Sequence, residues 1–360
     1  MKKLSIILPT EAKLEESENN GLLSRWRFYF SELSKHFELD VFSCDTKNYS
    51  ESLKIKHHPL PFSFFFIPFG NQILYNFYLL FLSFKMTKVI RIVSASYFTL
   101  PFLKLFGKKI ILSYSYDYAT TTKKDFGGFK GITSGFREWL SIKSAKIIIC
   151  TTQELSNKIK IKYGKGSVII PNFVNTNNFA PAKKNNTILY AGRIYWHKGI
   201  DYLIEAFKKV ETIFPELKLQ LAGTGEIDNY VEKAKNLKIK NIEFLGKIDN
   251  DKINSIMGSA KIFILPSLHR EGQPKALIEA MACGCACIAT NVDGNKDLII
   301  NRETGLLVNP KDKNDIVKAI TEICNDSFLY EKISTNAKLK AKFFSIGNTL
   351  GKEIELLKNY

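Results

Sequence analysis

The sequence has 360 residues, which is enough for two domains with complete cores. Its hydrophobic content of 45% and charged content of 24% are those of a folded globular chain and exclude a low-complexity or disordered polymer. The net charge is +17, and residues 1–172 hold most of it, with 25 Lys and Arg against 13 Asp and Glu. Such a basic half indicates nucleic acid, a phospholipid surface or a phosphorylated substrate as partner, unless the excess only reflects genome composition.

The N-terminal half is expected to alternate strands and helices as a doubly wound domain. The chain starts with basic residues and an apolar run of about five residues, which predicts a first strand rather than a signal peptide. A helix is expected over residues 22–37. Strands are expected over residues 4–10, 37–43, 88–96, 108–115 and 145–152.

A phenylalanine-rich segment in this half contains no Asp, Glu, Lys or Arg between Lys56 and Lys85. Prolines and a glycine interrupt it up to Gly70, and the remaining helix over residues 71–84 has only 14 residues. A spanning helix needs about 20 apolar residues, so two interpretations stay open. The segment is either a buried core helix or a surface that enters a membrane interface beside basic residues.

The C-terminal half has a clear alternation of strands and helices, which predicts a parallel sheet covered on both faces. The domain boundary is expected in residues 171–181, which are rich in Asn and bracketed by prolines. Strands are expected over residues 187–194, 217–225, 241–248, 261–267, 285–291 and 304–310. Helices are expected over residues 200–215, 228–239, 250–260 and 313–326, and a further helix is expected to carry Glu279.

Candidate ligand-binding groups follow three of these strands at their carboxyl ends, where doubly wound sheets bind their ligands. Arg193 and Lys198 follow the first, Gly223 and Gly225 the second, and Glu271 the fourth. Two cations and a glycine turn suit a diphosphate, and a carboxylate suits sugar hydroxyls. Each signal is weak alone, because a charged side chain after a strand is usually solvated.

The stretch "REGQPKALIEAMACG" adds a second carboxylate, Glu279, eight residues after Glu271. Pro274 fits the first turn of a helix, so Glu271 is expected just outside the helix start, beside its free amides. Glu279 is expected in the second turn, on the side of the ligand. The pair predicts one acid for a sugar and one for the ribose of a nucleotide sugar.

Residues 188–310 resemble the donor domain of retaining glycosyltransferases of family 4, which have the GT-B architecture. Within that family the stretch "REGQPKALIEA" is most similar to members that build bacterial surface polysaccharides and lipid-linked glycans. The segment "IIPNFVNTNNFAP" just upstream resembles the family's interdomain stretch. The matching pieces, in order, are "YAGRIYWHKGIDYLIEAF", "LQLAGTGE", "IEFLGKI", "FILPSLHREGQPKALIEAMACG", "IATNVDGNKDLI" and "TGLLVNP".

The resemblance implies an α/β fold of two doubly wound, Rossmann-like domains that face each other across a cleft. The expected domains are an acceptor-binding domain over residues 1–172 and a donor-binding domain over residues 173–340. A C-terminal helix over residues 341–360 is expected to pack back toward the first domain.

The resemblance also implies roles for single residues. Arg193 and Lys198 would grip the donor diphosphate, Glu271 would contact the transferred sugar, and Glu279 would bind the ribose. The expected donor-binding residues also include Gly192, Gly223, Gly225, Gly272, Gln273 and Gly21.

This chain departs from the family pattern at several positions. Phe173 and Asn175 stand where the family often has Gly and Asp, and Asp297 stands where a Glu is common. The first βα loop, "ESENNG", has Gly21 in place of a glycine pair. The segment "ILSYSYDYA" has no His, so Asp117 is the expected acceptor-side residue.

The cysteines and histidines favour ordinary structural roles. Six cysteines scattered over a long chain indicate free thiols in a reducing compartment. The alternation in "CGCAC" favours small residues on a buried strand over a metal site, so no metal is expected. His197 and His269 flank the expected site, and the pair at His57 and His58 has no evident partner.

The function expected from these features is metal-independent, retaining transfer of a sugar from a nucleoside diphosphate sugar, by default a UDP-sugar, to an acceptor hydroxyl. No bound cofactor is expected beyond this substrate. The acceptor is expected to be lipid-linked or a polysaccharide, as in surface polysaccharide or lipopolysaccharide synthesis. Two alternatives are an epimerase of nucleotide sugars with the same fold and a non-enzymatic basic module for membrane or nucleic acid.

The expected location is cytoplasmic, on the inner face of the cytoplasmic membrane. The positive N-terminal half would meet the anionic leaflet through Lys85, Lys88 and Arg91, beside the phenylalanine-rich segment. No nucleic-acid-binding motif is present in the sequence, so no nucleic-acid partner is expected.

Overall fold

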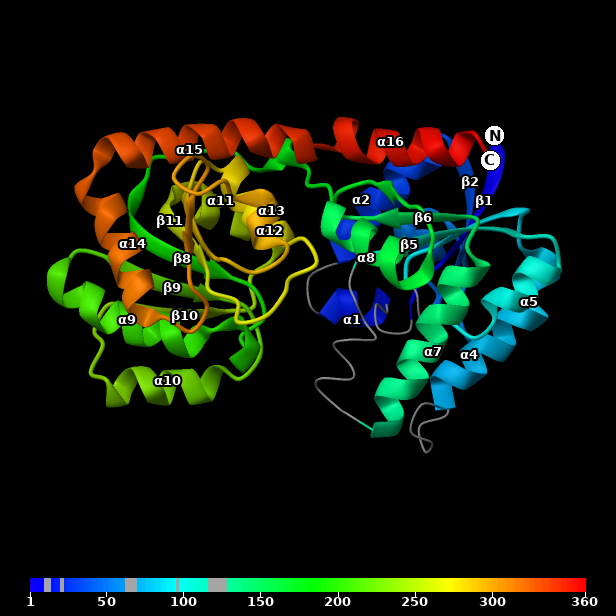
Figure 1. Ribbon diagram of the computed structural model, residues 1–360, viewed down its shortest axis with the longest axis horizontal. Coiled ribbons are helices and arrows are strands. Elements are labelled where there is room, and N and C mark those ends of the chain that lie inside the picture. The colour runs from blue at the N-terminus through cyan, green and yellow to red at the C-terminus, as the bar shows by residue number, and fades with distance from the viewer. Residues whose placement is uncertain (10–13, 20–22, 62–69, 95–96, 116–127) are drawn as a thin grey trace. The chain divides into compact units, whose positions relative to one another are not determined.

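The chain divides into two compact units, which are described separately. The first comprises Met1–Ile170 together with Glu353–Tyr360, and the second comprises Pro171–Lys352. The computed structural model describes residues 1–9, 14–19, 23–61, 70–94, 97–115 and 128–360 (Figure 1). Both units are built around a parallel β-sheet with helices on its two faces.

The first unit contains a seven-stranded sheet in the order β3-β2-β1-β4-β5-β6-β7. Its strands pair in parallel, and most of their Ile, Val and Leu side chains are buried, as expected for a sheet covered on both faces, whereas Val168 on the edge strand β7 is exposed. The strands are β1 (Lys2–Ile7), β2 (Phe37–Phe42), β3 (Lys56–His58), β4 (Val89–Ile92), β5 (Lys109–Tyr114), β6 (Ile147–Cys150) and β7 (Val168–Ile169).

One helix of the first unit is formed by the second part of the phenylalanine-rich segment. The helices are α1 (Leu14–Asn19), α2 (Leu23–Ser34), α3 (Ser50–Leu53), α4 (Gly70–Phe81), α5 (Leu100–Leu105), α7 (Gly128–Ser144), α8 (Gln153–Tyr163) and the 3-10 turn η1 (Ser83–Lys85). Helix α4 buries Tyr75 and Leu79 in the core but leaves Phe77 and Phe81 exposed. One side of this helix is therefore buried in the core, as the first interpretation of the segment expects, and the other side is an exposed aromatic surface. Among the described residues, no helix is long and apolar enough to cross a bilayer.

The second unit contains a six-stranded parallel sheet in the order β10-β9-β8-β11-β12-β13. The strands are β8 (Asn185–Ala191), β9 (Lys218–Ala222), β10 (Ile242–Gly246), β11 (Ala260–Leu265), β12 (Ala286–Thr290) and β13 (Leu306–Val308). The helices are α9 (Ile200–Ile213), α10 (Ile227–Asn236), α11 (Asn250–Ser259), α12 (Lys275–Ala282), α13 (Asn295–Leu298), α14 (Lys313–Asn325) and α15 (Ser327–Ala341). Helix α16 (Ile346–Lys358) begins in the second unit, and its residues from Glu353 onward belong to the first unit. Short 3-10 turns lie at η2 (Thr176–Asn178), η3 (Trp196–Lys198) and η4 (Lys342–Phe344). The prediction of two Rossmann-like domains is confirmed.

The strand order fixes where a ligand site belongs in the second unit. From β8 the chain winds outward to β9 and β10, and then returns to place β11 on the other side of β8. The winding direction reverses between β8 and β11, so the loops after these two strands diverge and leave room at their carboxyl ends. The expected site residues Arg193, Lys198 and Glu271 belong to these two loops.

The alternating cysteines lie where α12 passes into β12: Cys283 caps α12, Cys285 precedes the strand and Cys287 lies on it. Cys283, Cys285 and Cys287 are all buried, and all residues of β12 are buried. Burial raises the pKa of the Cys283 thiol to about 12 and that of Cys285 to about 11, so both thiols stay protonated and unreactive. The small side chain of Cys287 fits a strand covered by helices on both faces.

Arg91 lies in the interior of the first unit, and the expectation that it faces a membrane is wrong. It is 4% exposed, and its Nε donates to Glu353 Oε1 at 2.6 Å. Its other nitrogens donate to the Ile92 carbonyl at 2.7 Å and to Ser113 Oγ at 2.6 Å. The hydroxyl of Tyr29 donates to the same carboxylate oxygen at 2.8 Å. A buried guanidinium needs this full set of partners, which a sequence pattern does not reveal.

The histidine pair also has partners in the structure. His57 is buried, where its Nδ1 accepts a hydrogen bond from the Tyr49 backbone amide at 3.0 Å, and its Nε2 lies 2.8 Å from Ser43 Oγ. Burial lowers the pKa of His57 to about 4, so the ring is neutral at pH 7. His58 Nε2 lies 2.9 Å from Asp40 Oδ1. Both rings bind structural partners on β2 and its neighbours.

Replacing Glu353 by Ala leaves the Arg91 guanidinium buried without its counter-charge. We expect the free energy of unfolding to fall by about 3–5 kcal/mol, the scale for removing one member of a buried ion pair. Urea denaturation of the full chain measures this change. The control is Glu355→Ala, because Glu355 is exposed on the same helix, and a change within about 0.5 kcal/mol is expected there. Equal effects of the two substitutions would contradict a stabilising role for the buried pair.

Candidate active site

An ion pair joins the loops that leave β8 and β11. Lys198 Nζ lies 2.6 Å from Glu271 Oε1, although the two residues are 73 positions apart in the sequence. Ser267 Oγ donates a second hydrogen bond to the same carboxylate oxygen. Each side chain of the ion pair is 15% exposed, so the pair lies at the edge of the solvent and not in the core. A cation and a carboxylate are thus held together where the winding direction of the sheet reverses.

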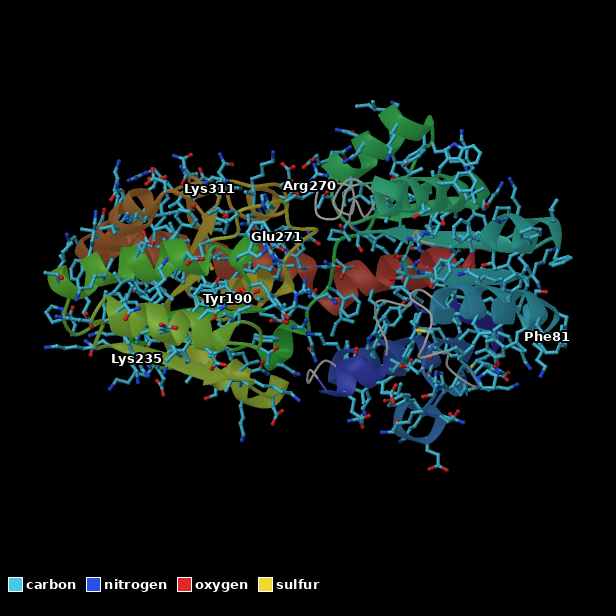
Figure 2. The ribbon with its side chains drawn as sticks, turned by 90° about the horizontal axis from the view of Figure 1, so that it is seen from below. Phe81, Tyr190, Lys235, Arg270, Glu271 and Lys311 are labelled. Carbon is cyan, nitrogen blue, oxygen red and sulfur yellow. The ribbon has the colours of Figure 1, made fainter. Side chains whose placement is uncertain are left out.

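The loop that carries Glu271 is fixed from several sides. The Leu268 amide donates to the His197 carbonyl at 2.9 Å, and the Glu271 amide donates to the Asp293 carbonyl at 2.9 Å. Arg270 places its Nε and Nη2 at 3.0 and 2.7 Å from Asp293 Oδ2. Figure 2 labels Arg270 and Glu271 on this loop. The Glu271 carboxylate is therefore held in place before any ligand binds, as a site that relies on prearranged charges requires.

Gly223 and Gly225 allow the loop after β9 to pack against the loop after β8. Both have positive φ, at 148° and 144°. A Cβ on Gly223 would lie 1.7 Å from the Gly192 carbonyl oxygen, and one on Gly225 would lie 2.1 Å from that of Ile194. The close approach seen here is thus to a neighbouring protein loop. Any larger residue would push apart the two loops that frame the expected diphosphate site.

Arg193 is exposed, and its backbone is anchored to the sheet below it. Tyr190, at 0% exposure, donates from its hydroxyl to the Arg193 carbonyl at 2.6 Å. Burial, and next the nearby Glu271 carboxylate, raise the pKa of Tyr190 well above its ordinary value, while Arg193 acts in the opposite direction. Tyr190 is therefore a neutral hydrogen-bond donor that positions the backbone of Arg193. Figure 2 labels Tyr190 near Glu271.

Gln273 connects the same loop to the start of the second unit, a link that the sequence does not predict. Its side-chain Oε1 accepts from the Asn172 amide at 2.5 Å, and its carbonyl accepts from Asn172 Nδ2 at 2.8 Å. The Lys275 ammonium lies 5.5 Å from the ring centroid of Phe173. Phe173, one of the departures from the family pattern, thus lies beside Lys275, the first residue of helix α12. The side-chain oxygen and the carbonyl of Gln273 therefore both bind Asn172.

Glu279 lies on α12 and is 6% exposed, within a run of buried residues from Leu277 to Ala282. Pro274 is the N-cap residue, one position before the expected first turn, and its carbonyl accepts from the Ile278 amide at 3.4 Å. A buried carboxylate in an apolar helix is costly unless partners satisfy it. Glu279 is thus set back from the solvent-edge pair formed by Lys198 and Glu271.

An aromatic cluster lies beside Lys198, and sequence reasoning missed it as a whole. Trp196 is 54% exposed and meets His197 and His269 edge-on, with ring centroids 5.8 and 5.5 Å apart. Tyr195 stacks on His197 at 5.9 Å with an interplanar angle of 7°. The sequence offered one signal for this cluster, the adjacent aromatic residues 195 and 196 between Arg193 and Lys198. Its members come together only because the loops after β8 and β11 are neighbours.

Two expected site residues, Gly21 and Asp117, lie outside the described residues. In the part of the chain that the structure describes, no three His, Cys, Asp or Glu side chains cluster so as to hold a metal ion. The described charged groups at the site include the cations of Arg193 and Lys198 and the carboxylate of Glu271.

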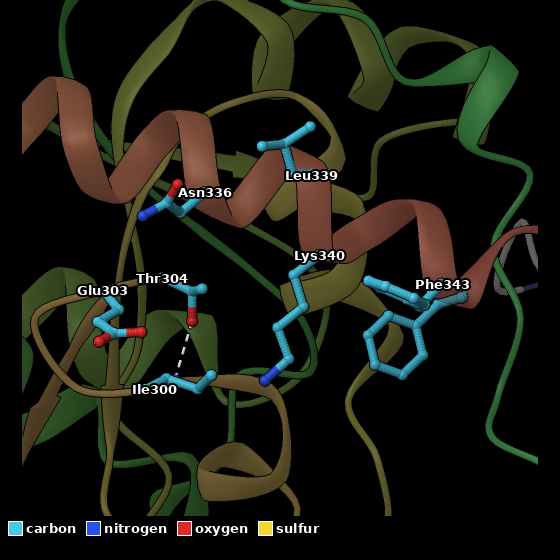
Figure 3. A pocket seen from close by; sticks show the side chains of 8 residues that line it. Ile300, Glu303, Thr304, Asn336, Leu339, Lys340 and Phe343 are labelled. Carbon is cyan, nitrogen blue, oxygen red and sulfur yellow. Dashed lines mark hydrogen bonds between the residues drawn. The ribbon is translucent and has the colours of Figure 1, made fainter.

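A cavity of about 490 Å³ lies elsewhere in the second unit, between residues 300–304 and the end of α15 (Figure 3). Lys340 lines it and points to the Asp297 carbonyl at 3.4 Å, and burial lowers the pKa of this lysine. The remaining lining residues are Ile300, Glu303, Thr304, Asn336, Leu339, Phe343 and Phe344. None of the expected site residues lines this cavity.

Residues 174–340 match the family described as glycosyl transferases group 1. An uncharacterized glycosyltransferase of Methanocaldococcus jannaschii is 30% identical over 58% of this chain and 58% of the relative. Phosphatidyl-myo-inositol mannosyltransferase of Mycolicibacterium smegmatis is 28% identical over 59% of this chain and 55% of the relative. CapM of Staphylococcus aureus, a capsular polysaccharide biosynthesis glycosyltransferase, is 30% identical over 57% of this chain and 50% of the relative. The chain thus spans little more than half the length of these relatives.

Solved structures resemble the whole chain. Sucrose-phosphate synthase of Thermosynechococcus elongatus has a TM-score of 0.82 at 19% identity and covers 99% of both chains. HepE of Anabaena, in complex with UDP and glucose, has a TM-score of 0.79 at 15% identity and covers 100% of both. At such identities the likeness shows the fold. Residues 174–340 therefore form a domain that belongs to the glycosyl transferases group 1 family, within a chain that has the GT-B fold.

Proposed function

We propose that this chain is a retaining glycosyltransferase that moves a sugar from a nucleoside diphosphate sugar to an acceptor hydroxyl. The observation that carries the proposal is the Lys198–Glu271 ion pair at the carboxyl edge of β8 and β11. A cation for the diphosphate and an acceptor for sugar hydroxyls are adjacent there, in a domain of the group 1 family. UDP is the favoured nucleotide, and HepE, a structural relative, was solved with UDP and glucose.

The chemical demand of this reaction is the charge of the leaving group. When the bond between the sugar and the phosphate breaks, negative charge grows on the nucleoside diphosphate. Arg193 and Lys198 would stabilise this charge, and they are anchored by Tyr190 and by the fixed loop of Glu271, respectively. Fixed groups that stabilise developing charge commonly contribute more to enzymatic catalysis than any other single effect. The departing phosphate oxygen would accept the acceptor's proton on the same face, so no separate general base is required.

Glu271 would accept hydrogen bonds from hydroxyls of the transferred sugar while Lys198 turns toward the phosphate. Lys198 already has a counter-charge in the structure, so donor binding must share or replace that contact. The exchange is feasible at the solvent edge, where desolvation costs are small compared with those of the core. The backbone of Gly192, Gly272 and Gln273 would line the sugar and phosphates, and Glu279 would bind the ribose.

For the acceptor we favour a lipid-linked or polysaccharide glycan, in bacterial surface polysaccharide, lipopolysaccharide or lipid-linked glycan synthesis. Relatives named for phosphatidyl-myo-inositol and for capsular polysaccharide support this choice. The chain would work in the cytoplasm on the inner face of the membrane, bound peripherally to anionic lipid, without nucleic acid as a partner. In this proposal Asp117 is the acceptor-side residue and Gly21 a donor contact.

A panel of nucleotide sugars tests the function directly. Purified chain should release the nucleoside diphosphate from one of them, by slow hydrolysis or by transfer, and a UDP-sugar is expected to be the substrate. Activity should be unchanged in EDTA, because in this proposal the cations of Arg193 and Lys198, rather than a divalent ion, would face the diphosphate. Strict dependence on Mg²⁺ or Mn²⁺ would contradict this clamp. Conversion of the donor to an isomeric nucleotide sugar without an acceptor would indicate an epimerase.

Replacing Lys198 by Ala should lower turnover about a hundredfold or more, the scale for losing one group that stabilises transition-state charge. Steady-state kinetics with the identified donor measures this. The matched control is Lys235→Ala, since Lys235 is an exposed lysine on α10 of the same unit (Figure 2). Near-normal turnover of a folded Lys198→Ala protein would refute the proposed diphosphate contact.

Replacing Glu279 by Ala should weaken nucleotide binding by about 1–3 kcal/mol, the scale for a hydrogen bond to a charged group. Isothermal titration calorimetry with UDP measures the affinity, and thermal unfolding reports damage to the helix separately. Glu331→Ala serves as control, because Glu331 is exposed on α15. A less stable protein with unchanged UDP affinity would show that Glu279 is only a buried structural carboxylate.

A further inference from the structure

Three helices of the first unit cover the same face of its sheet. Tyr75 and Leu79 of α4, Leu100 and Leu103 of α5, and Ile142 of α7 belong to one core cluster with residues of β4, β5 and β6. Two hydrogen-bonded links hold the helices together at the turn into α5. Asn76 Oδ1 on α4 accepts from the Phe98 amide at 3.1 Å, and Ser141 Oγ on α7 accepts from the Tyr97 amide at 3.2 Å. Figure 1 shows α4, α5 and α7 as neighbours.

The outer sides of these helices carry large exposed aromatic residues. We call this surface the aromatic face, and its main members are 45–70% exposed: Phe77, Phe81, Phe102, Phe106, Phe136 and Trp139. Phe136 stacks on Trp139 at 6.0 Å, and Phe98 lies 6.3 Å from Phe136. Figure 2 shows Phe81 at the periphery of its unit. Clustered exposed apolar residues of this size indicate a contact surface, since single ones are ordinary.

Among the described residues, the exposed charge on the helices of the aromatic face has one sign. Residues 52–116 contain no Asp or Glu at all. Among the described residues of α4, η1, α5 and α7, the one acid is Glu138, which is buried and pairs with Lys162 at 2.9 Å. Lys85, Lys88 and Lys104 are exposed beside the aromatic residues, and Lys85 lies 5.9 Å from the ring centroid of Phe84.

We propose that the aromatic face docks on an anionic lipid bilayer. Aromatic rings beside lysines match the interface of such a bilayer, where rings enter the acyl boundary and ammonium groups meet lipid phosphates. A second copy of the chain is a poor occupant, because a two-fold contact would bring the same lysines together without opposing acids. The inference deepens the proposed function, on which it rests for a lipid-linked acceptor, by naming the surface that meets the membrane.

Vesicle co-sedimentation of the full chain tests this docking without donor or acceptor. Binding should be weak on phosphatidylcholine, rise when phosphatidylglycerol is mixed in, and fall with added salt. The variant Phe81→Ser with Phe102→Ser should bind the mixed vesicles about tenfold or more weakly, because two apolar groups no longer enter the interface. Lys85→Gln with Lys104→Gln should reduce binding and its salt dependence.

Matched controls come from exposed residues of the second unit. Phe328 and Phe343 are 79% and 70% exposed, so changing both to Ser removes as much exposed aromatic surface. Lys235→Gln with Lys332→Gln removes two exposed charges there. Both controls should bind vesicles like the unchanged chain, and thermal unfolding of all variants confirms folding. Equal losses in the controls would overturn the assignment to the aromatic face.

A second readout places Trp139 in the bilayer. Brominated lipid should quench part of the tryptophan fluorescence, and Trp139→Phe should abolish that quenching. Trp196→Phe should not, although Trp196 is 54% exposed against 45% for Trp139. A chain that stays in the supernatant with anionic vesicles at low salt, or that dimerises through this face instead, overturns the proposal. Vesicle binding without sugar transfer would refute the enzymatic function and leave the docking intact.

Discussion

The ion pair between Lys198 and Glu271 is the contact on which the organisation of the second unit converges. Its members belong to the loops after β8 and β11, the two neighbouring strands between which the winding direction reverses. Backbone hydrogen bonds from Leu268 and Glu271, the Arg270–Asp293 pair and the Gly223 and Gly225 turn all hold the same loops. The strand order thus leaves room at the carboxyl ends of β8 and β11, and the ion pair places opposite charges there.

The ion pair between Arg91 and Glu353 in the first unit has the opposite physical character. Arg91 and Glu353 are buried, and the guanidinium has partners on all three nitrogens, so exchange with a ligand would be costly. Lys198 pairs with Glu271 and retains contact with solvent. A charged pair at the solvent edge can exchange partners with a diphosphate, whereas a fully satisfied buried pair only stabilises the fold. Burial and the number of partners separate the two pairs, and charge alone does not.

The charge excess of the N-terminal half is likewise divided between interior and surface. Arg91 serves the core, and Lys165 donates to the carbonyls of Ile142, Lys143 and Ala145 at the end of α7. A cation there compensates the helix dipole and carbonyls that lack helical partners. Lys85, Lys88 and Lys104 are exposed instead, beside aromatic residues. A net charge from the sequence thus includes lysines and arginines that never meet a partner molecule.

The sequence by itself determined the two parallel-sheet domains, because strand and helix periodicities depend on local patterns of apolar residues. It also determined which strand ends carry Arg193, Lys198 and Glu271, since these residues directly follow apolar runs. Tertiary structure alone decided the Asn172–Gln273 link, the aromatic cluster at Trp196 and the burial of Arg91. These contacts join residues far apart in the sequence, and local periodicity carries no information about which loops become neighbours. The aromatic face likewise exists because α4, α5 and α7 share one side of the sheet, a consequence of winding order rather than of any single segment.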